Sequence, residues 1–363
     1  MKRSLAVALA LAALVAPAFA GDFSIAPTGI RTRWWVVPTG VDLEAKYRLP
    51  SLLEGKASYL DLRAGGGWED RSLFRDPITG EPLPNADPDG ADTAVLDDYT
   101  WLNFQWDLAF YQGLVPGGYK ADLLEAFVMY RGRFDKTLAK AGETPAFDDW
   151  DELFYTGFMG GLCWNGLFKD RHGLREGLYA EGTFELAPGA LNASLADFRR
   201  ASAKAAYALP LFGEKDEMGG FQGYLIDFAA VDYAQGEAVP AYVNQSFGGR
   251  ILRDSLGDCV RGYISRSYDA GLKAVNNLEL RVNGPAFLKD SLYPIAFAFV
   301  DAGYYGGYAG APAAYADDSG FLASAGGGIA LSVLDLAQVS FVVAQPFAEK
   351  DSFWWAIKLF LHF

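Results

Sequence analysis

The chain has 363 residues, 51% of them hydrophobic and 15% aromatic, with 41 glycines but only two cysteines and two histidines. This composition excludes a disordered or collagen-like chain and a disulfide-rich scaffold, favours β structure, and leads us to expect no metal or cofactor. The formal net charge of −14 argues against nucleic-acid binding, which needs a basic surface.

The first twenty residues have the pattern of a secretory signal peptide. A basic start at Lys2 and Arg3 is followed by the short apolar run 5–17 and by an A-x-A cleavage site before Gly21. A short membrane anchor is the alternative, but the run is too short to span comfortably. We therefore expect a signal peptide at 1–20 and a single exported domain at 21–363.

The exported part lacks a window of about 18 uncharged apolar residues that would form a membrane helix. It alternates instead with a period of two: between residues 101 and 110, Asn103, Gln105 and Asp107 stand between apolar residues. The same alternation recurs in 42–49, 178–186 and 277–282. A soluble sandwich also alternates, but long strands recurring along the whole chain are typical of a membrane barrel.

The pattern predicts fourteen strands, and an even number places both termini on one side of the membrane. The fold class is therefore all-β, a transmembrane antiparallel β-barrel, with sixteen strands if a further N-terminal hairpin is hidden near residues 22–30. Long connections at 67–98, 136–151 and 235–272 are expected on the outer side. The strands are expected at 29–38, 41–50, 57–66, 99–114, 120–135, 152–167, 176–188, 196–210, 219–234, 273–284, 293–305, 319–333, 335–346 and 352–362.

The segment 68–98 is rich in acids and turn residues, with nine acids and two arginines. A calcium loop is one interpretation, but the spacing of a calcium-hand motif is absent. We expect a solvated surface loop.

The last expected strand is apolar at every second residue and ends on an aromatic ring. Bacterial outer-membrane proteins resemble this pattern, in which the terminal Phe is an assembly signal for the machinery that inserts the barrel. An exposed strand of this kind would be an aggregation hazard in a soluble protein. The residues are Phe353, Trp355, Ile357, Leu359, Leu361 and Phe363.

Four pieces between residues 219 and 363 resemble, in order, the barrel of the outer-membrane assembly-factor superfamily. This is the BamA and two-partner-secretion type, also called bacterial surface antigen. The strongest are a V-R-G-F/Y loop motif and an F-x-D-x-G strand motif. The pieces are 240–249 (PAYVNQSFGG), Val260-Arg261-Gly262-Tyr263, 299–303 (FVDAG), and 326–332 (GGGIALS) with 344–347 (AQPF).

The resemblance implies that the long sixth loop folds into the barrel lumen, where Arg261 meets Asp301 on the wall. Gly262 would permit close backbone approach. Phe299, Asp301 and Gly303 share one strand face, so all three can face the lumen. The alternative is that Arg261 and Asp301 are two unrelated surface charges.

The chain departs from the family in two respects. Family members usually carry periplasmic POTRA domains before the barrel, whereas here the strand rhythm begins by about residue 29, so we expect none. The family barrel has sixteen strands, whereas fourteen can be counted.

The sequence leaves open a disulfide and a pair of acidic residues. Cys163 and Cys259 could form a disulfide in the oxidising periplasm and staple the loop inside the barrel. Glu181 and Glu185 could mimic an acid/base pair, but a network of lumen charges is the better interpretation. Its other expected members are Asp61, Arg63, Glu125, Arg131, Arg133, Lys204, Glu279 and Arg281.

Two functions follow from these predictions. The first is protein transport or outer-membrane assembly, with an unfolded polypeptide client and a separate POTRA-bearing or periplasmic partner, by a chain integral to the bacterial outer membrane. The second is a passive or plugged pore, or a structural surface antigen. No catalytic motif is present in the sequence, so we do not expect an enzyme.

Overall fold

The computed structural model describes residues 23–33, 37–71, 99–119, 121–140, 152–192, 196–254, 256–263, 270–307, 319–333, 337–348 and 353–361. The expected signal peptide, most of the acidic segment 68–98 and Phe363 lie outside these ranges. Within them, no helix is long and apolar enough to cross a membrane.

Fourteen strands form one antiparallel sheet in which each strand pairs with its neighbours in chain order. The predicted number of fourteen is confirmed, and the described residues contain no additional N-terminal hairpin. The strands are β1 (Phe23–Arg33), β2 (Val37–Leu49), β3 (Ser58–Arg71), β4 (Tyr99–Val115), β5 (Leu124–Lys140), β6 (Glu152–Lys169), β7 (Arg175–Ala187), β8 (Asp197–Phe212), β9 (Gln222–Ala238), β12 (Leu272–Asn283), β13 (Leu292–Gly306), β14 (Ser319–Val333), β15 (Ala337–Pro346) and β16 (Trp354–Leu361).

The first strand begins earlier than the sequence predicts, at Phe23 instead of residue 29. The pairing of β1 with β2 shifts register between Pro27 and Gly29. Proline cannot donate to a strand ladder, and such a bulge breaks the alternation of side chains. The period of two is therefore readable only after Gly29, although the strand is continuous.

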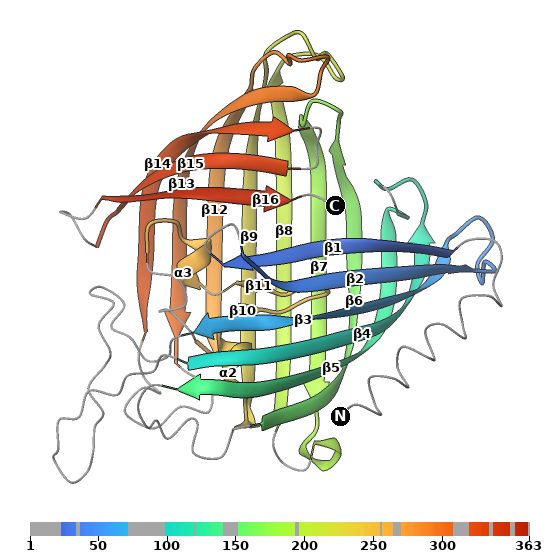
Figure 1. Cartoon of the computed structure of the whole chain (residues 1–363). Helices are drawn as coiled ribbons and strands as arrows, with labels where there is room; N and C mark the ends of the chain where they lie inside the picture. Colours follow the sequence, from blue (N-terminus) through green and yellow to red (C-terminus); the bar gives the residue numbers. More distant parts are fainter. Residues whose placement is uncertain are drawn as a thin grey trace, which may run out of the picture.

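The sheet curls round an enclosed space, with its two edge strands at the front of Figure 1. The edge strands β1 and β16 flank the seam, which is the place where pairing between them would close the sheet into a barrel. Among the described residues, no backbone pairing joins β1 to β16. The connection from β9 to β12 runs inside the curled sheet and carries four short elements, namely α2 (Ala241–Asn244), β10 (Ser246–Phe247), β11 (Arg253–Asp254) and α3 (Leu256–Cys259).

The outer face of the sheet is apolar and the inner face is charged. On β6, Phe158 and Leu162 are 51% and 53% exposed, whereas Cys163, which follows Leu162, and the inward Glu181 of β7 are buried. On β4, the predicted inner residues Asn103 and Asp107 are buried, and Leu108 points outward. A sheet with water on its outside would carry its polar residues on the outer face. An apolar outer face around a polar lumen is the arrangement of a barrel surrounded by lipid.

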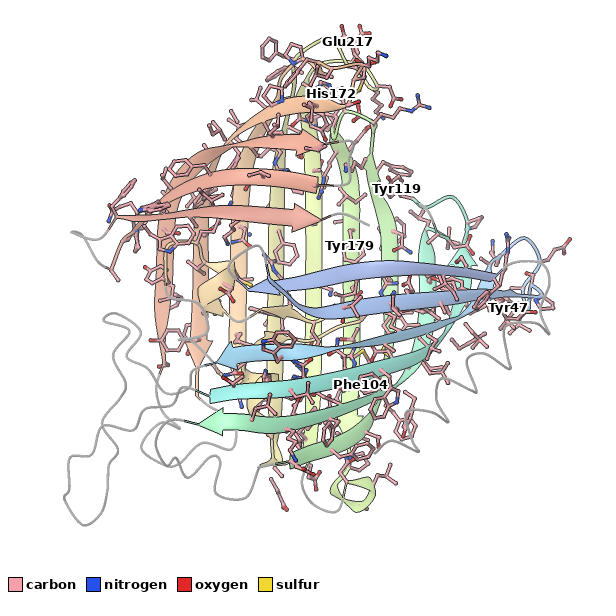
Figure 2. All side chains as sticks on the ribbon, in the orientation of Figure 1. Tyr47, Phe104, Tyr119, His172, Tyr179 and Glu217 are labelled. Carbon is pink, nitrogen blue, oxygen red and sulfur yellow. The ribbon has the colours of Figure 1, made fainter. Side chains whose placement is uncertain are left out.

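One end of the sheet carries short turns and the other carries the long connections, as predicted. We call the first the turn end; it also holds Phe23 and Leu361, the outer limits of the described strands. A buried imidazole ties three of its turns together. His172 contacts the backbone oxygens of Glu217, through Nδ1 at 2.9 Å, and of Gly284, through Nε2 at 2.8 Å. His172 and Glu217 stand at the top of Figure 2.

Candidate functional site

The connection 239–271, which we call the lumen loop, places its described residues, 239–254, 256–263 and 270–271, in the space inside the sheet. Val243, Phe247, Leu256 and Val260 are all 2% exposed or less. Such burial against the inner wall is the packing of a protein core. The long loop that the resemblance placed in the lumen is therefore inside the barrel.

The structure brings Arg261 of this loop against Asp301 of β13. The Arg261 Nε donates to Asp301 Oδ2 at 2.7 Å, and Nη2 donates to Oδ1 at 2.8 Å. The backbone N–H of Arg261 donates to the same carboxylate at 3.0 Å, and Nη1 donates to Glu279 of β12 at 2.6 Å. The guanidinium lies 3.5 Å from the centre of the Phe299 ring. This bidentate geometry is the strongest form of a charge-assisted contact.

The acidic partners of Arg261 stabilise the protonated, charged form of its guanidinium. Burial alone lowers the pKa of this guanidinium, but the hydrogen bond to Asp301 and the nearby charges of Asp301 and Glu279 outweigh burial and raise the pKa above its usual value. The Arg261 contact therefore persists over the physiological pH range.

Two glycines make this close approach possible. Gly262 has a φ of +100°, a conformation that disfavours side chains. A Cβ on Gly303 would stand 2.7 Å from both Leu256 Cδ1 and Val260 Cγ2 of the loop. The Tyr263 hydroxyl then donates to Ala323 O of β14 at 2.8 Å. The V-R-G-Y and F-x-D-x-G segments thus form one contact surface between loop and wall.

A second arginine fixes the loop to another part of the wall, at β7, four strands away from β13 in the sheet. Arg250 Nε donates to Glu181 Oε2 at 2.7 Å, and its Nη2 contacts Tyr179 and the Cys163 sulfur. The backbone N–H of Arg250 also donates to Glu181, at 2.8 Å. Lys204 lies 3.3 Å from the same carboxylate.

The possible disulfide between Cys163 and Cys259 is not formed, because both cysteines are free. The Cys163 sulfur lies on β6 against Asn165, at 3.0 Å, and Arg250. Cys259 ends helix α3 and packs with Leu256 on the side of the loop that faces β12.

A third group of charges lies between these two arginines. Arg200 of β8 donates to both oxygens of Asp232 at 2.9 to 3.1 Å, and to the loop carbonyl of Val243 at 3.2 Å. Lys273 of β12 reaches Asp232 at 3.3 Å and Val243 O at 3.2 Å. All three charged side chains are fully buried. Removing Asp232 would leave two buried cations without this shared carboxylate.

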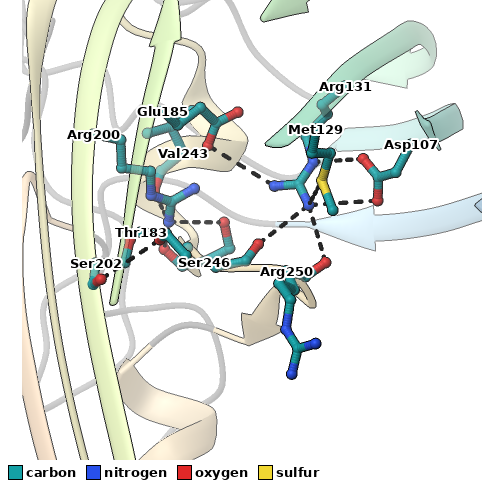
Figure 3. A network of polar contacts seen from close by, with 12 residues as sticks. Asp107, Met129, Arg131, Thr183, Glu185, Arg200, Ser202, Val243, Ser246 and Arg250 are labelled. Carbon is teal, nitrogen blue, oxygen red and sulfur yellow. Dashed lines mark hydrogen bonds and ion pairs between the residues drawn. The ribbon is translucent and has the colours of Figure 1, made fainter. Parts of the chain in front are cut away.

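Arg131 of β5 extends the network across the lumen (Figure 3). It donates to Asp107 at 2.7 Å and to the backbone oxygens of Gly249 and Arg250, both at 3.1 Å. Its Nη1 lies 3.8 Å from Glu185. Glu181 and Glu185 are therefore engaged with cations, which fits the lumen network better than an acid/base pair.

Sequence reasoning found part of this network and missed its centre. Glu181, Arg131, Lys204 and Glu279 were expected in the lumen. Arg200, Asp232, Lys273 and Arg250 were not. The first three lie on inner faces, so the alternation that revealed the others could have identified them; Arg250 lies in an irregular segment and has no such signal.

The C-terminal segment places Phe353 and Trp355 outward, whereas Trp354 packs against the buried cluster of Phe299, Val342 and Ala344. Phe353 and Trp355 are 65% and 59% exposed. Leu359 and Leu361 pair along the backbone with Val339 and Ala337. Ile357 pairs with Phe341. Within the described residues, no group of three metal-ligating side chains is present.

Comparisons with known proteins agree with this architecture. The barrel is similar to the crystal structure of BamA from Haemophilus ducreyi lacking POTRA domains 1–3, with 13% identity, a TM-score of 0.53, and coverage of 89% of this chain and 62% of that one. CdiB from Escherichia coli is similar at 15% identity with a TM-score of 0.47, over 88% of this chain and 53% of that one. No family model matches the sequence, and no curated protein matches it.

The chain therefore has the fold of the BamA-type outer-membrane barrel, as the sequence motifs predicted. It spans less than two thirds of the length of either solved chain.

Proposed function

We propose that this chain is integral to the outer membrane and acts in the insertion of polypeptides into that membrane or their secretion across it. The observation that carries the proposal is the lumen loop, which is held inside the barrel by Arg261 at β13 and by Arg250 at β7. In this proposal the loop is the gate of the barrel, and the charge contacts with the wall hold the gate in its closed position.

The two edge strands of the sheet, β1 and β16, are the place where such a barrel could open. Every neighbouring pair from β1 to β16 is joined by a backbone ladder, whereas the described residues of β1 and β16 are not joined to each other. Unpaired strand edges are templates for another strand. In this proposal a client strand pairs at the seam while the lumen loop keeps the pore closed.

The partners are inferred from the same resemblance. They are an unfolded polypeptide client and a separate POTRA-bearing or periplasmic protein that delivers it. The outer-membrane assembly machinery would insert this chain itself, using the outward aromatic strand β16.

The test is an insertion assay. The folded chain is reconstituted in liposomes, and the insertion of a small unrelated barrel is timed against empty liposomes. The proposal predicts faster insertion with the wild-type chain, loss of most of that acceleration in Arg261→Ala, and full activity in the control Lys215→Ala. Lys215 is exposed, lies in a turn and contacts only Glu176 among the described acids. Equal rates with wild type and empty liposomes would contradict the proposal.

A passive, plugged barrel is the second candidate. The buried triad of Arg200, Asp232 and Lys273 favours it, because this triad binds the loop to the wall without solvent access. In that case the folded chain would leave the insertion rate of the test barrel unchanged. We propose no enzymatic activity, since Glu181 and Glu185, the two carboxylates considered as an acid/base pair, both lie beside cations.

A further inference from the structure

Three consecutive glycines occur twice in the sequence, at 65–67 and at 326–328, each time after an alanine. Both triplets lie near the middle of a strand, the first in β3 and the second in β14. Strand β3 is the third from one edge of the sheet, and β14 is the third from the other edge. Each triplet therefore stands between the wall and an edge hairpin, β1–β2 or β15–β16, and Figure 1 shows these hairpins facing each other across the seam.

Glycine is unfavourable in the interior of a strand, because it has the greatest backbone freedom and no side chain to pack. Neither triplet makes a turn: Gly66 and Gly327 are paired with a neighbouring strand on both sides, and neither has a positive φ. Glycine within a strand marks a bend of the sheet or the close approach of another backbone. Two triplets at matching places therefore indicate a local property of the sheet.

Strand β15 comes unusually close to β14 at the second triplet. A Cβ on Gly326 would overlap the carbonyl oxygen of Val343, and a Cβ on Gly328 would overlap that of Phe341. Both oxygens belong to the backbone of β15, which cannot move aside without loss of the ladder. The sheet is therefore bent too sharply at this triplet for a side chain.

The first triplet is less crowded. A Cβ on Gly66 would stand 3.0 Å from the carbonyl oxygen of Asn103 on β4 and 3.2 Å from the ring of Phe104. A shift of a few tenths of an ångström would accommodate a methyl group here. Space alone therefore gives no strong reason for glycine at this position, whereas backbone freedom does.

One aromatic side chain reaches across the second triplet. Phe299 of β13 lies over Gly326, where a Cβ would stand 2.7 Å from its ring. The same ring packs with Val342 and Ala344 of β15, and Trp354 of β16 packs against this cluster. The ring thus holds the β15–β16 hairpin to the wall by apolar contact. Such contact is non-directional, so the hairpin can shift against the ring without breaking a hydrogen bond.

We propose that the two glycine triplets are hinges on which the hairpins β1–β2 and β15–β16 bend away from each other. A hinge consists of a few residues that take up a change in φ and ψ, and glycine does so at the lowest steric cost. The ladders on both sides of each triplet stay paired, so the seam widens without unfolding of an edge strand. The inference rests on the proposed function in taking the seam as the opening, whereas the bending itself requires no client.

The test measures distances across the seam by pulsed electron spin resonance, on the folded full-length chain in liposomes without a client. Spin labels are attached to Leu43→Cys on β2 and Val339→Cys on β15, where the native side chains are 46% and 45% exposed on the outer face. The native Cys163 and Cys259 are replaced with alanine. The proposal predicts one population of short distances, with the hairpins close together, and a second population of longer distances, with the hairpins bent apart.

The variant Gly66→Ala separates a hinge from a mere need for space. Alanine has less backbone freedom than glycine, so this variant should reduce the longer population about two- to fivefold. The control Gly182→Ala in β7, whose Cβ would meet nothing within 4 Å, should leave both populations unchanged. An unchanged or larger longer population in Gly66→Ala, or a single narrow population in the wild type, overturns the proposal.

A second variant leaves the glycines in place. Phe299→Leu removes the ring that holds β15–β16, so the longer population should increase. The control Phe228→Leu on β9, whose ring lies 3.9 Å from the Arg253 guanidinium, should leave it unchanged. No increase in Phe299→Leu would also overturn the proposal. A chain that shows both populations but does not accelerate insertion would keep its hinges and lose the proposed function, and accelerated insertion by a chain with a single population would do the reverse.

Discussion

Replacing Arg261 with alanine removes the contact that defines the loop and wall motifs. The substitution deletes two side-chain hydrogen bonds to Asp301 and one to Glu279. Asp301 is fully buried, so its carboxylate would keep only the backbone N–H of residue 261 as a donor among the contacts described here. Glu279 would still be compensated by Arg281.

The cost follows from this geometry. Removing one partner of a buried pair costs about 3–5 kcal/mol. The guanidinium is 16% exposed and the lumen is partly wet, so we take the lower end, about 3 kcal/mol. At about 2 °C per kcal/mol for a large domain, the unfolding midpoint should fall by about 6 °C.

The assay is the loss of folded mobility on a gel after heating in detergent. The double variant Arg261→Ala/Asp301→Ala serves as the control, because it removes the buried charge along with its partner. We expect the double variant to be more stable than the sum of the two single changes predicts. An unchanged midpoint in Arg261→Ala, or strictly additive effects, would refute the reasoning.

Three further predictions follow from contacts of the loop and the turns. Gly303→Ala should lower the unfolding midpoint, because the new Cβ would stand 2.7 Å from the loop. Gly182→Ala is the control, because its Cβ would meet nothing within 4 Å. Apart from the small gain that alanine gives over glycine in a strand, this control should change the midpoint by no more than about 1 °C. Cys163 and Cys259 should both react with a thiol reagent after unfolding without reductant; failure of both to react would show a disulfide. His172→Phe should cost about 1–3 kcal/mol by removing both carbonyl contacts and speed proteolysis at turn 213–221, and equal cleavage rates would count against the role of the imidazole.

Much of the barrel could be predicted because the alternation of side chains records the two environments of its wall. Asn103 and Asp107 face the lumen and Leu108 faces outward, so a period of two is enough to locate β4 and its faces. The pattern failed at β1, where Pro27 interrupts it. It also gave no account of loops, which have no period.

The candidate site was predictable only where a motif marked it. Arg261 and Asp301 were found because their neighbours resemble a known pair of motifs. Arg250 contributes as many contacts, but its place depends on the β10–β11 pairing that turns the loop back on itself. The possible disulfide of Cys163 could not be judged from the sequence for the same reason. Two cysteines far apart in sequence can both lie inside the barrel without contact, and only the path of the loop determines whether they are close enough to bond.

We propose that the lumen loop closes the barrel through its contacts at Arg261 and Arg250. Ion conductance across a planar bilayer tests it most directly, comparing the wild type with Arg261→Ala/Arg250→Ala and with Lys215→Ala. We predict a closed wild type and control, with only brief openings, and sustained large openings of the double variant. Wild-type conductance equal to that of the double variant, whether both are open or both are closed, would contradict the claim.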